Sequence, residues 1–187
     1  MPRAERWRTI DTRSLQTLPT AAADWIALPT SLTAHLASQL GDEVRVRVLS
    51  ERHDRFLASE HDLLCTPARA GRIREVQLEV RGTPFVVART VFPAATARVA
   101  NRALMRLGTR ALGSLLFGAM RAPASMRQYI RLCSRSSLWR TLHTHLPECA
   151  GHLWARRALH RLHGEPLLVT EIFLPSLFDG TRPAASG

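Results

Sequence analysis

The chain has 187 residues, 26 basic and 15 acidic side chains, a net charge of +11 and no lysine. Its 45% hydrophobic and 22% charged content is typical of one globular domain, which excludes disordered and collagen-like chains. No apolar run approaches the ~20 residues of a membrane span, and no apolar signal segment follows the first residues. Three widely spaced cysteines fit a reducing compartment, so we expect a cytoplasmic protein.

The positive charge makes a nucleic acid a candidate partner. The arginines are distributed over predicted strands and helices, however, and the sequence has neither a zinc-finger spacing nor an aromatic RNA-binding motif. We therefore expect no nucleic-acid partner. The charge either reflects the replacement of lysine by arginine on a basic surface, or its field concentrates an anionic small molecule or a nucleic acid near a cleft.

The N-terminal third predicts one helix and one strand. Ser31 precedes leucines spaced four residues apart and Gly41 follows them, which predicts a helix over 32–40. Residues 44–48 alternate between valine and arginine, the pattern of a half-buried strand. The polar segment 50–70 shows no such period, and we expect it to be irregular.

Two β-hairpins are predicted, each with a glycine in its turn. The first joins a strand over 73–80 to an apolar strand over 85–92, which Pro93 closes. The second joins 154–162 to 166–174. Because the strand over 85–92 is apolar on both faces except at its centre, it should be central in a sheet.

Between the hairpins we expect helices over 95–107 and 112–120, and a third helix after Pro123. Hairpins with helices gathered in blocks predict an α+β fold, a single domain with an antiparallel sheet of about six strands. We expect this domain to cover residues 18–176, with 1–17 as an N-terminal extension and 177–187 as a flexible tail.

Two charged residues have the parity of core residues in their strands. Arg74 shares a face with Val76 and Leu78, and Glu171 shares a face with Val169 and Phe173. Burying either charge is costly unless it is paired or hydrogen-bonded.

Two interpretations of these residues stay open. In the structural one, Arg74 and Glu171 pair with each other or with Arg89 as a buried salt bridge. In the functional one, an enclosed polar cavity lies on the sheet, where Arg74 holds an anionic group and Glu171 contacts the part of the ligand where protons move.

Four segments of the sequence are similar to those of a known family. IREVQLEVRGTPFVVARTVFP, LGTRALGSLLF and WARRALHRLHGEPLLVTEIFLP, together with WIALPTSLTAHL, resemble the chorismate pyruvate-lyase family over residues 18–175. The resemblance implies a lyase that converts chorismate to 4-hydroxybenzoate and pyruvate, the first committed step toward ubiquinone. It also implies an antiparallel sheet with helical flaps over an enclosed ligand, and no cofactor or metal. We expect the substrate and product to be the only partners of a monomer.

The resemblance also assigns roles to individual residues. It implies that Arg74 binds the ring carboxylate and that Glu171 is the family's buried glutamate, so both are candidate catalytic residues. Ligand contacts are implied for Leu112, at the start of a short helix, and for Leu32, where the family often has methionine. Arg89 is a further candidate for the second carboxylate of chorismate.

The sequence departs from the family pattern at several positions. Arg72 occupies the place of a tryptophan, Arg110-Ala111 replaces Thr-Pro, and the segment 118–153 is longer than expected. These departures concern the helical flaps more than the chemistry.

The histidines offer a candidate metal site. His143, His145, Cys149 and His152 have the composition of a metal site but not its usual spacing, and we expect no metal there. We expect His160 and His163, near a turn, to be solvated.

The alternative function is a non-catalytic domain that binds small aromatic acids, as in the effector-sensing half of some transcription regulators. The roughly seventeen residues before the resemblance are too few for the DNA-binding domain of such a regulator.

Overall fold

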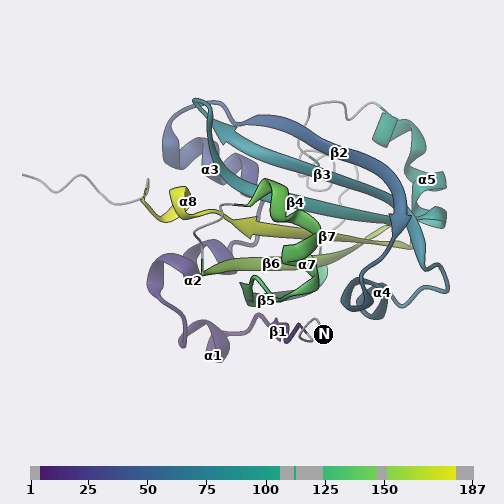
Figure 1. Cartoon of the computed structure of the whole chain (residues 1–187), viewed down its shortest axis with the longest axis horizontal. Helices are drawn as coiled ribbons and strands as arrows, with labels where there is room; N and C mark the ends of the chain where they lie inside the picture. The colour runs from purple at the N-terminus through teal and green to yellow at the C-terminus, as the bar shows by residue number, and fades with distance from the viewer. Residues whose placement is uncertain (1–4, 106–111, 113–123, 147–150, 180–187) are drawn as a thin grey trace, which may run out of the picture.

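The computed structural model describes residues 5–105, 112, 124–146 and 151–179, and its described strands form one antiparallel sheet. The strand order is β1-β5-β6-β7-β4-β3-β2, with β1 and β2 at the two edges (Figure 1). The strands are β1 (Arg8–Thr9), β2 (Arg45–Arg55), β3 (Ala70–Val80), β4 (Thr83–Pro93), β5 (Ala124–Cys133), β6 (His152–Leu162) and β7 (Glu165–Phe173).

Short helices connect and cover these strands. They are α1 (Thr12–Leu15), α2 (Thr20–Ala27), α3 (Leu32–Leu40), α4 (Ala58–Leu64), α5 (Ala94–Met105), α7 (Ser137–Leu142), the 3₁₀ turn η2 (His143–His145) and α8 (Pro175–Asp179). None of the helices in the described part of the chain is long and apolar enough to cross a membrane.

The predicted α+β fold with an antiparallel sheet is confirmed. Helix α3 begins after Ser31, whose hydroxyl accepts a hydrogen bond from the Ala34 amide. It ends at Gly41, whose φ of 64° is one that glycine adopts without strain.

Both predicted hairpins are present. Their turns are Arg81-Gly82 and His163-Gly164, and all four residues have positive φ. This backbone is typical of two-residue type I′ turns, whose twist matches that of the strands. Strand β4 lies between β3 and β7, so it is central in the sheet as expected and both of its edges are paired.

Three expectations about the elements are wrong. Within the residues that the structure describes, the sheet has seven strands rather than six, because Arg8–Thr9 in the expected N-terminal extension pairs with β5. The polar segment 50–70 is largely ordered, since β2 continues to Arg55 and α4 follows. The residues after Pro123 form strand β5, not a helix, because they pair with β6 along their whole length. Of the helix expected over 112–120, only Leu112 lies within the described residues.

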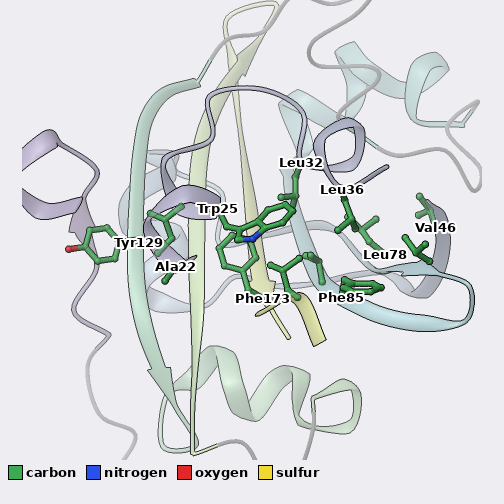
Figure 2. Packing of buried hydrophobic residues seen from close by; sticks show 13 residues of the cluster. Ala22, Trp25, Leu32, Leu36, Val46, Leu78, Phe85, Tyr129 and Phe173 are labelled. Atoms are coloured by element: carbon green, nitrogen blue, oxygen red, sulfur yellow. The ribbon is translucent and has the colours of Figure 1, made fainter. Parts of the chain in front are cut away.

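The two faces of the sheet bury separate clusters. On the face that we call the α2–α3 face, Trp25 and Leu32 pack with Leu78, Val86 and Phe173. Figure 2 shows Trp25 between Leu32 and Phe173. On the opposite face, the α4–α7 face, Val87 and Ile172 pack with residues of α7, and Leu64 of α4 packs with Val91 and Leu168. Helix α5 contacts β3, β4, β6 and β7.

Candidate active site

The parity of Arg74 and Glu171 predicts their positions correctly. Both side chains lie on the α2–α3 face, in line with Leu78 and Phe173. The Arg74 residue is 5% exposed, so its guanidinium is buried as expected.

A pocket on this face brings together three of the predicted site residues. It lies between the α2–α3 link, Leu112 and strands β5 to β7, and its lining includes Leu32, Leu112 and Glu171. Leu32 is the first residue of α3, so its position depends on the Ser31 cap described above. Leu112 also packs near the buried Phe92 and Leu167. The pocket therefore combines apolar walls with a carboxylate.

Glu171 pairs with an arginine that the sequence analysis did not single out. Arg156 is the cross-strand partner of Glu171, and its Nε donates a hydrogen bond to Glu171 Oε2 at 2.5 Å. The side chains of Arg156 and Glu171 are 8% and 18% exposed. Because an ion pair that is largely removed from water fixes the orientation of its partners, Glu171 is held by β6 as well as by β7.

A second arginine, Arg127 of β5, also lines the pocket. Its guanidinium donates to the carbonyl oxygens of Ile26, Ala27 and Leu28. Burial lowers the pKa of Arg127, and repulsion from Arg156 lowers it further. With Arg127 and Arg156 against Glu171, the pocket carries an excess of positive charge that favours an anionic ligand.

Arg74 lies on the same face but is not in the pocket lining. The register places Arg74 opposite Thr90, and Thr90 opposite the lining residue Val169. Two strand spacings separate these backbones, about 10 Å. Arg74 Nη1 donates to Glu51 Oε2 at 3.0 Å, so this arginine pairs with Glu51 of β2. The expected pairing of Arg74 and Glu171 with each other or with Arg89 is therefore wrong, because Arg74 pairs with Glu51 and Glu171 with Arg156, both part-buried carboxylates.

The structure does not bring Arg89 to this pocket. Its side chain lies on the α4–α7 face, where its Nε donates to Glu60 at 2.7 Å and its Nη1 to Glu75 at 2.5 Å. Burial opposes the charge of this guanidinium, but the bonds to Glu60 and Glu75 raise the pKa of Arg89. The interpretation of Arg89 as a ligand for the second carboxylate is therefore wrong in its geometry, because neighbouring residues of a strand point to opposite faces.

The histidines are placed differently from one another. His160, expected in solvent, is 3% exposed and lines the pocket, because it has the same parity as Arg156. His143 and His145 lie in η2 and His152 begins β6, while Cys149 is outside the described residues. Among the residues that the structure describes, no three histidine, cysteine or acidic side chains are placed to hold a metal ion.

Comparison with known proteins assigns the chain to a family. A family model described as chorismate lyase matches residues 1–182. The chain belongs to the chorismate lyase family. A "Probable chorismate pyruvate-lyase" of Dechloromonas aromatica is 37% identical over 82% of this chain and 86% of its own length. Another, of Halorhodospira halophila, is 42% identical over 81% and 80%.

Solved structures support the fold of this chorismate lyase family member. The effector domain of PhnF from Mycobacterium smegmatis matches with a TM-score of 0.52 at 8% identity, over 80% of this chain and 91% of that one. The ligand-binding domain of a GntR-family regulator from Bordetella bronchiseptica matches with 0.51 at 17% identity, over 71% and 85%. At these identities the likeness concerns the fold alone.

Proposed function

We propose that this member of the chorismate lyase family converts chorismate to 4-hydroxybenzoate and pyruvate, as the first committed step toward ubiquinone. The observation that carries the proposal is the position of Glu171 in a pocket whose lining includes three arginines, on the same sheet face as Arg74. A carboxylate beside an excess of buried positive charge suits a dianion that must lose a proton during the reaction.

The reaction is an elimination that makes the ring aromatic. Chorismate carries a hydroxyl at ring carbon 4 and an enolpyruvyl ether at the neighbouring carbon. When the hydrogen on carbon 4 leaves as a proton, its electron pair forms the ring double bond and the ether C–O bond breaks. The leaving enolpyruvate takes up a proton to become pyruvate, so the atoms of chorismate divide between the two products.

Each candidate residue has a role in this elimination. Arg74 lies on the same face but outside the pocket lining, and we propose that it exchanges its bond to Glu51 for the ring carboxylate. Its planar guanidinium is suited to two parallel hydrogen bonds. Glu171 accepts a hydrogen bond from the 4-hydroxyl or moves the proton from the ring. Leu32 and Leu112 pack on the ring and keep water from it, as supported by their place in the pocket lining.

The chemistry needs no electron acceptor and no Lewis acid. The gain in aromatic stability supplies much of the driving force, so the residues must mainly hold both carboxylates, orient the ether and exclude water. We therefore propose a reaction without metal or cofactor.

The test is an assay of the purified chain with chorismate. Pyruvate release is followed with a coupled dehydrogenase, and binding of 4-hydroxybenzoate is measured by calorimetry on the same preparation. We expect multiple turnovers and competitive inhibition by 4-hydroxybenzoate. Tight binding of 4-hydroxybenzoate without pyruvate release from chorismate would contradict the enzyme and favour the alternative, a non-catalytic domain that binds aromatic acids.

A further inference from the structure

Arg156 contacts both the candidate catalytic carboxylate and the wall of the pocket. Its Nε donates to Glu171 Oε2, while its Nη1 donates to the carbonyl oxygens of Trp25 at 2.9 Å and Leu28 at 2.8 Å. The first bond spans β6 and β7, and the other two reach the end of α2. One guanidinium therefore joins three elements.

The carbonyls at the end of α2 explain why an arginine lies there. The last four carbonyls of a helix have no partner within it, and a cation is favourable at this end of the helix dipole. After α2 ends at Ala27, residues 28–31 lead directly to Leu32 and line the pocket. A bond from Arg156 to Leu28 thus fixes the pocket wall relative to Glu171.

Arg127 provides an internal comparison. It donates to the same turn, at the carbonyls of Ile26, Ala27 and Leu28. Both arginines line the pocket, and both cap α2. Of these two described side chains, however, Arg156 is the one for which the structure shows a bond to Glu171.

We propose that Arg156 is a positioning residue for the lyase reaction, which acts through Glu171. By fixing Oε2, the guanidinium sets the plane of the carboxylate and ties it to the link that carries Leu32. An error of about 1 Å in the position of such a group can reduce a rate about 100-fold, so its orientation matters as much as its presence. The inference rests on the proposed function, because Glu171 must act on chorismate for its orientation to affect turnover.

The experiment is a double-mutant cycle with a matched control. Arg156→Lys and Arg127→Lys are each made in the wild-type and in the Glu171→Gln background, and kcat and KM for chorismate are measured for all. Lysine keeps the charge but cannot donate to Glu171 and to two carbonyls in one plane. Arg156→Gln is a second variant at the same position, so that one poorly folded protein does not decide the result. Thermal melts establish that each variant is folded.

We expect Arg156→Lys to lower kcat about 10- to 100-fold in the wild-type background, and less than about 3-fold when Glu171 is already glutamine. Arg127→Lys should act equally in both backgrounds, mainly through KM. Equal losses of kcat for Arg156→Lys in both backgrounds would overturn the inference, because Arg156 would then only cap α2. A wild-type chain that releases no pyruvate from chorismate would instead overturn the proposed function, and this inference with it.

Discussion

The two faces of the sheet both bury arginines against carboxylates, but they leave those carboxylates in different states. On the α4–α7 face, Arg89 pairs with Glu60 and Glu75, whose side chains are 4% and 2% exposed. On the α2–α3 face, the side chains of Glu171 and Glu51 keep 18% and 29% of their exposure. The first set is sealed, because the gap beside Glu60 has no room for a water molecule, whereas Glu171 borders a pocket that does have room.

This difference shows that a buried charge in a strand does not by itself mark a binding site. Among the residues that the structure describes, every fully buried side-chain nitrogen or oxygen has a hydrogen-bond partner. Whether the buried polar atoms have hydrogen-bond partners therefore does not distinguish the two faces. The remaining exposure of the carboxylate and the adjacent cavity do distinguish them. We infer that the α4–α7 face, the sealed face, serves stability, and that the α2–α3 face, the open face, serves chemistry.

The largest effect should come from breaking the sealed face. Glu60→Gln removes one of the two negative charges around Arg89, and loss of a buried ionic partner costs about 3–5 kcal/mol. We expect the melting temperature to fall by roughly 6–20 °C, while kcat per folded molecule is unchanged. A melt combined with a pyruvate assay measures both, and a thermally normal but inactive variant would invert our assignment of the faces.

Glu171→Gln should give the opposite result. Glutamine keeps the volume and an acceptor for Arg156 but cannot exchange the proton, so we expect turnover to fall about 100-fold or more. The melting temperature should fall less than for Glu60→Gln, because Arg156 and Glu171 keep more contact with water and Arg156 keeps its bonds to Trp25 and Leu28. The two assays used for Glu60→Gln apply here. Near-normal turnover with a marked loss of thermal stability would show that Glu171 only balances the charge of Arg156.

A smaller effect is expected at Arg74, which tests how far the open face extends. Arg74→Lys keeps the charge but loses the planar fork, so binding of 4-hydroxybenzoate should weaken by about 1–3 kcal/mol, or roughly 5- to 150-fold. Calorimetric titration of both proteins measures this. An unchanged affinity would mean that Arg74 serves Glu51 alone and has no part in binding the carboxylate.

No effect is expected from metal removal. Activity should survive prolonged incubation with EDTA, because the elimination needs no Lewis acid. Turnover before and after dialysis against the chelator is the measurement. If activity were lost and added zinc restored it, His143, His145 and His152 would be indicated as a metal site.

Much of the fold and part of the site could be predicted from the sequence. The hairpins follow from alternating patterns around glycine turns, and the parity of Arg74 and Glu171 places both on the buried α2–α3 face. The second hairpin also carries a signal for the ion pair of Glu171. A two-residue turn at His163-Gly164 fixes the register of β6 and β7, and that register sets Arg156 opposite Glu171.

The remainder depends on contacts that no local pattern encodes. The apolar spacing of residues 124–133 fits a helix, but the segment lies between β1 and β6, and sheet pairing overrides the local preference. Arg89 lies on the other face because a β-bulge between Leu78 and Glu79 shifts the register by one residue, which puts Arg89 opposite Glu75. Neither the pairing of 124–133 in the sheet nor this bulge follows from a local pattern.

The central claim is that the open face converts chorismate through Glu171, and a single-turnover experiment tests it most directly. Wild-type protein in excess over chorismate is quenched at intervals beside Glu171→Gln, and chorismate, 4-hydroxybenzoate and pyruvate are measured in each sample. Our account predicts that the wild-type protein consumes chorismate and forms one pyruvate per 4-hydroxybenzoate, whereas Glu171→Gln leaves most chorismate intact over the same times. Recovery of intact chorismate from the wild-type protein, or equal rates for the two proteins, would contradict it.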